Sequence, residues 1–267
     1  MQHPAWPTIG QRLRAAGLHV MLLTNGLLLK KQAAHLSDSV DEVIVSLDGG
    51  TPATYQHIRG VDAFNLVLEG IAAAHAAGLP VTTRTTVQRA NFRELPQIIR
   101  AAQGAGADVV SFLPIDVSSD FAFGARADLL PMQGQQALTA AEVDAFEAIL
   151  QAMEGDFAAD FASGRLAEPP QKLRRLALYF RSLLDDSPYP PPRCNAPHFS
   201  AVLEVDGRLR PCYFLPEWGA LGQQSLAEAL NQPEAVALRR AYRTGQRPEC
   251  ARCVCPLYKG PRALLRP

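Results

Sequence analysis

The sequence predicts an α/β fold with a parallel sheet, followed by a small cysteine-rich α+β domain that binds a metal. Three observations predict it. Apolar, strand-like runs alternate with helical patterns over residues 1–116, which is typical of βαβ units. A proline-rich stretch at 185–193 reads as a linker. All 5 cysteines follow that stretch, three of them within residues 249–256.

Composition sets limits on size, partners and location. At 267 residues and 48% hydrophobic composition, the chain can bury one large core or two smaller ones. Its 26 basic and 26 acidic residues balance, so neither nucleic acid nor an anionic membrane is expected as a partner. Residues 1–10 lack the features of a secretory signal. We therefore expect a cytoplasmic protein. Structural disulfides are disfavoured in the cytoplasm.

The expected strands of the first region lie at residues 18–24, 41–48, 81–87 and 108–116. Helices are expected between them, at 62–78 and at 91–106, because apolar residues recur there at helical spacing. In the second of these helices, Asn91 is the expected N-cap and Glu94 its capping-box partner. Strands that alternate with helices at this spacing imply a parallel sheet.

Two further helical patterns, at 140–154 and 171–184, precede the proline-rich linker. The expected domains are accordingly a sheet domain at 1–135, a segment of helices and linker at 136–193, and the cysteine-rich domain at 194–267. These boundaries follow the composition and the periodicity of the sequence.

A two-residue hairpin turn is expected at Asp206-Gly207 in the cysteine-rich domain. An Asp-Gly pair between alternating apolar residues is among the strongest hairpin signals in a sequence. The register that follows from such a turn sets Ala201 opposite Cys212. The hairpin would therefore return Cys212 toward the segment that starts at Cys194.

The five cysteines are the candidate metal ligands. They follow the spacing C-x17-C-x37-C-x2-C-x-C and are Cys194, Cys212, Cys250, Cys253 and Cys255. Disulfides are disfavoured by the odd count, and a role as buried apolar residues is disfavoured by the Glu, Arg and Pro around the last three. Clustered thiolates suit a soft metal, either tetrahedral zinc or an iron–sulfur cluster. The spacing alone does not choose between these two.

Polar residues at the ends of the expected strands form a second candidate site. They are Thr24, Asn25, Ser46, Asp48 and Arg84. The carboxyl ends of parallel strands form the functional edge of such a sheet. The third strand reads Thr-Thr-Arg-Thr-Thr, although an inner parallel strand is normally apolar throughout. Either this strand lies at a solvated edge, or its arginine faces a cavity that holds a small molecule with a carboxylate.

Several sequence segments, taken together, resemble those of one protein family. Those in the first region are 22–29 (LLTNGLLL), 43–60 (VIVSLDGGTPATYQHIRG) and 82–99 (TTRTTVQRANFRELPQII). In the last domain, Cys194-x12-Gly207-x4-Cys212 is followed by Cys250-x2-Cys253. With these motifs the chain resembles a radical S-adenosylmethionine (SAM) enzyme with a C-terminal SPASM or twitch-type auxiliary-cluster domain.

The resemblance implies strands three to six of a six-stranded partial (β/α) barrel. It implies that Thr24 and Ser46 lie near SAM and that Arg84 contacts its methionyl carboxylate. The ligands that it implies for one auxiliary [4Fe–4S] cluster are Cys194, Cys212, Cys250 and Cys253. An intact enzyme of this kind cleaves SAM reductively and abstracts a hydrogen from its substrate, often a peptide or protein. It takes electrons from a donor such as a flavodoxin or ferredoxin.

The chain departs from the family pattern in two places. The C-x3-C-x2-C motif that holds the radical-generating cluster and the Gly-Gly-Glu-Pro element of the second strand do not occur in it. We therefore expect a sequence truncated before the third strand, or else a degenerate paralogue, with an exposed apolar edge at 18–24 and no SAM cleavage by this chain alone. The auxiliary pattern also ends at Cys255, which allows one cluster with one thiol to spare.

The alternative hypothesis is a non-catalytic α/β binding protein with a structural zinc knot. No G-x-G-x-x-G motif follows a strand, which disfavours a dinucleotide-binding dehydrogenase. Beyond a possible peptide or protein substrate, neither the individual substrate nor the product is predicted from the sequence, and no catalytic residue is assigned. Metal content separates the two hypotheses, because a cluster contains about four irons whereas a zinc knot contains one zinc.

Overall fold

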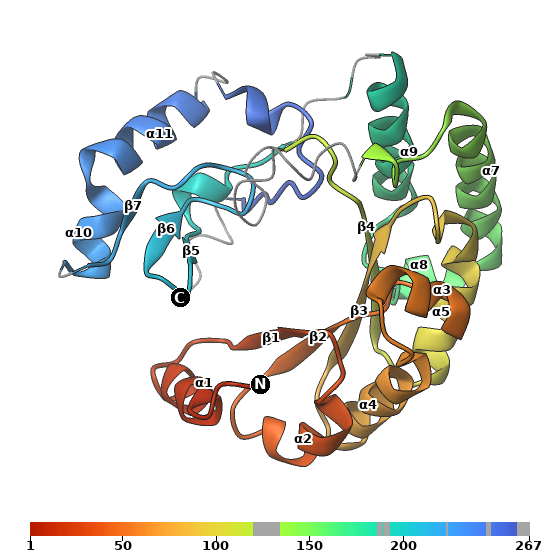
Figure 1. The fold of residues 1–267 in the computed structure, drawn as a ribbon, viewed down its shortest axis with the longest axis horizontal. Helices are drawn as coiled ribbons and strands as arrows, with labels where there is room; N and C mark the ends of the chain where they lie inside the picture. Colours follow the sequence, from red (N-terminus) through yellow and green to blue (C-terminus); the bar gives the residue numbers. More distant parts are fainter. Residues whose placement is uncertain (120–133, 186–188, 190–192, 223, 244–246, 261–267) are drawn as a thin grey trace. The chain divides into compact units, whose positions relative to one another are not determined.

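The computed structural model describes residues 1–119, 134–185, 189, 193–222, 224–243 and 247–260. Figure 1 shows their helices and strands. The chain divides into two compact units: Met1–Ile115 with Leu138–Phe180, and Asp116–Ala137 with Arg181–Pro267. The predicted boundaries at 135 and 193 were based on sequence composition, whereas these units are defined by packing. The helices within 138–180 belong to the first unit.

The first unit is built on one parallel sheet. Its strands, in spatial order, are β1 (Met21–Thr24), β2 (Glu42–Ser46), β3 (Val81–Val87) and β4 (Val109–Pro114). All three neighbouring pairs are parallel. The predicted α/β class with a parallel sheet is therefore confirmed, and each strand lies inside its predicted range.

Helices precede the first strand and connect the strands. They are α1 (Trp6–Ala15), α2 (Leu29–Leu36), α3 (Pro52–Arg59), α4 (Phe64–Ala76), the 3-10 turn η1 (Phe92–Glu94) and α5 (Leu95–Gly104). In Figure 1, α2, α4 and α5 lie on one side of the sheet. Their apolar residues recur every three or four positions, as Val67, Ile71 and Ala74 do in α4, and these residues are fully buried.

The two faces of the sheet differ in burial. Along β3, Val81, Thr83, Thr85 and Val87 are buried, whereas the alternate residues, Thr82, Arg84 and Thr86, are half-buried. Successive side chains of a strand point to opposite faces, so Arg84 lies on the face away from the helices. Since β3 pairs with both β2 and β4, the hypothesis that it is a solvated edge strand is wrong.

In the described part of the chain between residues 134 and 185, the helices are α7 (Ala140–Asp156), α8 (Ala158–Ser163) and α9 (Pro170–Asp185). Thr139 and Glu142 form a capping box that fixes the start of α7. The ring of Phe146 in α7 packs edge-on against Phe92 at 6.0 Å and against Phe180 of α9 at 6.3 Å. These aromatic contacts anchor the helices to the sheet, through the turn that precedes α5.

The segment between α8 and α9 covers part of the β4 edge. Val110 forms a parallel bridge with Leu166. The buried carboxylate of Glu168 then accepts hydrogen bonds from the Ser111 hydroxyl at 3.0 Å and from the Phe112 N–H at 2.8 Å. Backbone groups at this edge are thereby satisfied, which lowers the tendency of the edge to pair with another chain.

The second unit is small and short in regular structure. Its elements are η2 (Ala196–His198), β5 (Val202–Leu203), β6 (Arg208–Arg210), β7 (Gly219–Ala220), α10 (Leu226–Asn231), α11 (Pro233–Arg243) and η3 (Pro248–Cys250). The three strands form an antiparallel sheet in chain order. Its buried apolar cluster, which includes Leu215 and Trp218, packs against Cys212 and Cys250. No helix among the described residues is long and apolar enough to span a membrane.

The hairpin register differs by one residue from the prediction. Leu203 pairs with Leu209, and the Glu204 N–H donates to the Arg208 carbonyl at 2.8 Å, which leaves three residues in the turn instead of two. Gly207 has φ +86°, the left-handed conformation that closes a three-residue hairpin loop. The predicted pairing of Ala201 with Cys212 is therefore wrong.

The β1 edge of the sheet is apolar and exposed. Met21 is 52% exposed and Leu23 is 60% exposed, and among the described residues β1 pairs only with β2. An edge strand of this kind is a template for pairing with another chain. We expect wild-type protein to self-associate, and the substitution Leu23→Lys to raise the monomer fraction in sedimentation velocity.

The matched control is Leu178→Lys, because Leu178 is 40% exposed but lies on α9 rather than on a strand edge. Self-association that both substitutions reduce equally, or a monodisperse wild-type monomer, would contradict the role of the edge.

Candidate metal centre and polar strand ends

All five cysteines line one cavity of the second unit, with a volume of about 30 Å³. This thiol cavity is lined by Cys194, Ala196, Pro197, Cys212, Phe214, Leu215, Tyr242, Glu249, Cys250, Cys253 and Cys255. None of the cysteines is in a disulfide; four are half-buried and Cys255 is exposed. Segments up to 61 positions apart in the sequence (194 to 255) thus meet at one point.

Hydrogen bonds of Asn195 link the start of the cysteine-rich domain to the C-terminal segment that follows Cys255. Its backbone N–H donates to the Leu257 carbonyl at 3.0 Å. Its side-chain amide donates to the Lys259 carbonyl at 2.8 Å and accepts from the Lys259 N–H at 2.9 Å. These hydrogen bonds hold Cys194 beside the tail, and the Leu257 N–H lies 3.4 Å from the Cys194 sulfur.

The hairpin positions Cys212. The Ser200 hydroxyl donates to the Pro211 carbonyl at 2.8 Å and thereby fixes the backbone before Cys212. Backbone N–H groups of Phe214 and Leu215 then donate to the Cys212 sulfur. Hydrogen bonds of this kind stabilise thiolates and set the potential of a cluster that they ligate.

Burial and mutual proximity raise the pKa of three of these thiols. Burial is the largest cause for Cys212, Cys250 and Cys253, and the neighbouring thiolates add to it. The pKa of Cys250 rises to about 12. Without a compensating cation these thiols remain protonated at neutral pH, whereas a bound metal deprotonates a coordinating thiol. The arrangement is therefore suited to a cationic group in the cavity.

The donor set consists of thiols, which suit a soft metal ion or an iron–sulfur cluster. The five thiols line a shared cavity. Among the described residues, no group of three or more His, Cys, Asp or Glu side chains is placed to hold a metal ion. Thiolates that enclose several irons are the ligand set of a [4Fe–4S] cluster.

Two polar cavity residues were not predicted from the sequence. Tyr242 of α11 donates a hydrogen bond through its hydroxyl to the Cys194 carbonyl, and burial raises the pKa of this tyrosine. Glu249 lies directly before Cys250 and lines the cavity. Proximity to the cysteines in sequence could have indicated Glu249, whereas no local signal indicates that α11 packs against this cavity.

The polar strand ends are only partly brought together. Ser46 and Arg84 are register partners across β2 and β3, so they lie on the same face of the sheet. Thr24 pairs with the buried Val45 and lies on the opposite face by strand alternation. Asn25 is exposed and accepts from the Leu27 N–H at 3.3 Å. Ser46 and Arg84 therefore form the centre of this candidate site.

Arg84 has an unsatisfied donor. Its Nε is buried and has no hydrogen-bond partner among the described residues. On the other side of β3, Ser111 is its register partner, and the Ser111 hydroxyl already donates to Glu168. A buried guanidinium N–H without an acceptor is costly. The site is therefore suited to an anion such as a carboxylate.

Asp48 has a different environment from the other strand-end residues. It is 4% exposed, its Oδ1 accepts from the Thr86 N–H at 2.7 Å, and its Oδ2 forms an ion pair with Arg59 at 2.8 Å. Burial raises its pKa above the ordinary value of 3.8, although the Arg59 charge and the Thr86 N–H act in the opposite direction. Both oxygens are thus used within the protein, to join the end of β2 to β3 and to α3.

The predicted capping box at Asn91 and Glu94 is wrong. The Asn91 side chain accepts from the Gln88 N–H and donates to the carbonyls of Asp48 and Thr86. Glu94 accepts from the Gly50 N–H at 2.8 Å and from the Thr54 hydroxyl at 2.6 Å. Both side chains therefore fix the loop after β2, and the helix α5 begins after the turn η1 instead.

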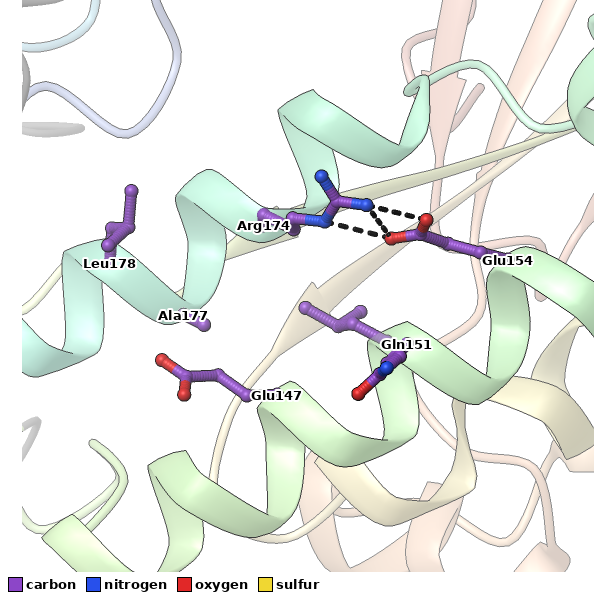
Figure 2. Close-up of a pocket in the computed structure, with 7 residues that line it drawn as sticks. Glu147, Gln151, Glu154, Arg174, Ala177 and Leu178 are labelled. Carbon is purple, nitrogen blue, oxygen red and sulfur yellow. Dashed lines mark hydrogen bonds and ion pairs between the residues drawn. The ribbon is translucent and has the colours of Figure 1, made fainter.

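A hollow of about 500 Å³ also lies between α7 and α9 (Figure 2). Arg174 of α9 forms an ion pair with Glu154 of α7 across it, and Leu150, Ala177 and Leu178 are its apolar lining residues. This hollow contains none of the predicted site residues. Its ion pair links the two helices.

Two protein families match the chain. The profile of the radical SAM superfamily matches residues 3–102, which include the whole sheet up to β3. The SPASM profile, described as an iron–sulfur cluster-binding domain, matches residues 194–254. The chain thus contains a radical SAM region and a C-terminal SPASM domain. The cofactors predicted from the sequence, SAM and an iron–sulfur cluster, are those of these two families.

Relatives with curated names match part of the chain. The chain is 40% identical over 106 residues to GTP 3',8-cyclase of Erythrobacter litoralis (strain HTCC2594), which is 36% of this chain and 32% of the relative. It is 30% identical over 139 residues to PqqA peptide cyclase of Streptomyces rochei, which is 51% of this chain and 38% of that protein. The chain thus spans about a third of the length of these relatives.

Solved structures share the fold. The structure titled "Native anSMEcpe with bound AdoMet" superposes with a TM-score of 0.58 at 15% identity, over 89% of this chain and 65% of that one. The structure titled "Native anSMEcpe with bound AdoMet and Kp18Cys peptide" gives a TM-score of 0.56 at 15% identity, over 89% and 66%. At this identity the likeness concerns the fold alone.

The raised pKa of Asp48 leads to a testable pH dependence. The folded radical SAM region holds the Asp48 proton more tightly than the unfolded chain does. Stability is therefore gained as pH falls from neutral through the folded pKa toward 3.8. We expect wild-type protein to gain stability relative to Asp48→Asn over that window, measured as the free energy of unfolding in urea.

Asp62→Asn, in the exposed turn before α4, is the control and should follow the wild-type curve. A wild-type advantage over Asp48→Asn that shrinks on acidification would contradict the burial of a charged Asp48.

Proposed function

We propose that the chain is an iron–sulfur protein of the radical SAM/SPASM type whose thiol cavity holds one auxiliary [4Fe–4S] cluster. The observation that supports this is the convergence of five thiols on one cavity. The proposed ligands are Cys194, Cys212, Cys250 and Cys253, the four that are half-buried. Cys255, which is exposed, is the spare thiol.

The protein contributes shape and hydrogen bonds to this site. A bound cluster supplies electron transfer or a binding point for substrate. Backbone N–H groups donate hydrogen bonds to the sulfur atoms of Cys194 and Cys212, two of the proposed ligands. The apolar lining by Pro197, Phe214 and Leu215 keeps water from the sulfur atoms.

We also propose that the polar strand ends contact SAM. Ser46 and Arg84 share a face, and the unsatisfied Arg84 Nε suits the methionyl carboxylate. The turn that contains Thr24 and Asn25 would border the same ligand. Asp48 would act on SAM only through the loop that it fixes, because both of its oxygens have partners within the protein.

The residues of this chain do not fit the radical-generating cluster. That cluster requires three closely spaced cysteines near the sheet, and the first cysteine of the sequence is Cys194. We therefore assign no radical step to this chain by itself. The reaction of a longer protein that contains the missing ligands would be reductive cleavage of SAM, with hydrogen abstraction from a substrate.

A peptide is the proposed substrate class. One relative is named PqqA peptide cyclase, and one structure of the same fold was solved with a peptide. The proposed electron donor is a small protein such as a flavodoxin or ferredoxin, and the proposed location is the cytoplasm, where the five reduced thiols would persist.

Anaerobic reconstitution with iron and sulfide tests the cluster. We expect about four irons per chain and a broad visible absorption. Serine at Cys194, Cys212, Cys250 or Cys253 should reduce both, whereas Cys255→Ser should keep wild-type iron content. One tightly bound zinc and no iron would instead support the zinc-knot alternative.

Binding of SAM tests the strand-end site. We expect weak binding by wild-type protein and at least roughly tenfold weaker binding by Arg84→Gln, because a charge-assisted hydrogen bond to a carboxylate is lost. Equilibrium dialysis with labelled SAM measures both. The control is Arg93→Gln, since Arg93 is exposed and its guanidinium stacks on Phe92 at 4.2 Å. Equal affinities for wild type and Arg84→Gln would contradict this contact.

A further inference from the structure

Glu249 has one carboxylate oxygen without a partner in the thiol cavity. Its Oε1 accepts a hydrogen bond from Nη2 of Arg247 at 2.5 Å. Its Oε2 is buried and has no hydrogen-bond partner among the described residues. The residue itself lines the cavity together with the five cysteines. It is thus the acidic residue of the cavity, and it lies immediately before Cys250.

The Arg247–Glu249 ion pair is oriented with its carboxylate toward the thiol cavity. The side chains of Arg247 and Glu249 are 24% and 19% exposed, so solvent screens them only in part. Glu249 lines the cavity, whereas Arg247 does not. The Glu249 carboxylate therefore lies on the side of the sulfur atoms, and Arg247 holds it in place.

An unpartnered buried carboxylate oxygen is costly unless a cation or a donor meets it. No described side chain meets this need at Oε2. A cluster held by four thiolates is negatively charged overall, so it does not supply that cation. The Arg247 guanidinium at Oε1 is therefore the charge partner that holds the carboxylate beside the cavity.

We propose that Glu249 is a positioning residue that places a fixed negative charge beside the auxiliary cluster and lowers its reduction potential. This inference rests on the proposed function. Reduction adds an electron to a centre that is already surrounded by thiolates, and a nearby carboxylate makes that addition less favourable. Arg247 sets the strength of the effect, because it orients the carboxylate and partly offsets its charge.

The test is an anaerobic redox titration of reconstituted protein, followed by electron paramagnetic resonance. The variants are Glu249→Gln, Arg247→Gln and the double variant. We expect Glu249→Gln to favour the reduced cluster about tenfold, which is 59 mV for a one-electron couple. Arg247→Gln should shift the potential in the negative direction, and the double variant should lie between wild type and Glu249→Gln.

Glu217→Gln is the matched control, because Glu217 forms an ion pair with Arg208 at 3.2 Å in the same unit but does not line the cavity. It should leave the potential unchanged. Wild-type protein that binds no iron would overturn both the proposed function and this inference. This inference alone would be overturned if wild-type protein binds the cluster but Glu249→Gln leaves its reduction potential unchanged. It would also be overturned if Glu249→Gln loses iron, because Glu249 would then be a ligand.

Discussion

The second unit depends on one electrostatic constraint, the crowding of five sulfur atoms around a single cavity. Burial raises the pKa of Cys212, Cys250 and Cys253, and the neighbouring thiolates raise it further. Such a group cannot carry its full negative charge without a compensating cation. The backbone donors beside Cys194 and Cys212 lessen the repulsion but do not remove it. We therefore interpret the second unit as a domain whose thiols surround a metal centre.

The two units obtain their order in different ways. The first has a parallel sheet with a continuous apolar layer beneath it, and the polar network around Asp48 and Asn91 only adjusts the strand ends. The second has strands of two or three residues and a small apolar cluster. A unit with so little core commonly needs a metal or other cross-link to be stable. Its hydrogen bonds through Asn195 are arranged to bring the thiols together.

The parts of the fold that could be predicted are those set by local periodicity. The four strands and the helix α4 follow from apolar spacing and from the glycine that ends the helix. The hairpin register could not be predicted, because Asp206-Gly207 fits two-residue and three-residue turns alike. Asn91 and Glu94 carried the signature of a capping box, but tertiary hydrogen bonds to the loop after β2 prevailed.

The cysteines could be predicted as one site, because their residue type and spacing are specific to metal binding. Tyr242 could not, since its contact with the Cys194 carbonyl arises from packing between distant segments. The polar strand ends were predicted as a group, yet strand alternation separates Thr24 from Ser46 and Arg84. The sequence indicates which residues are polar, whereas the register decides which of them meet.

The most direct measurement of the central claim is alkylation of the thiols in the native, anaerobically purified protein, with each site read by mass spectrometry. A cluster held by the thiol cavity predicts that Cys194, Cys212, Cys250 and Cys253 are protected until the metal is removed, while Cys255 reacts. Rapid alkylation of all five cysteines in the folded protein would contradict the account.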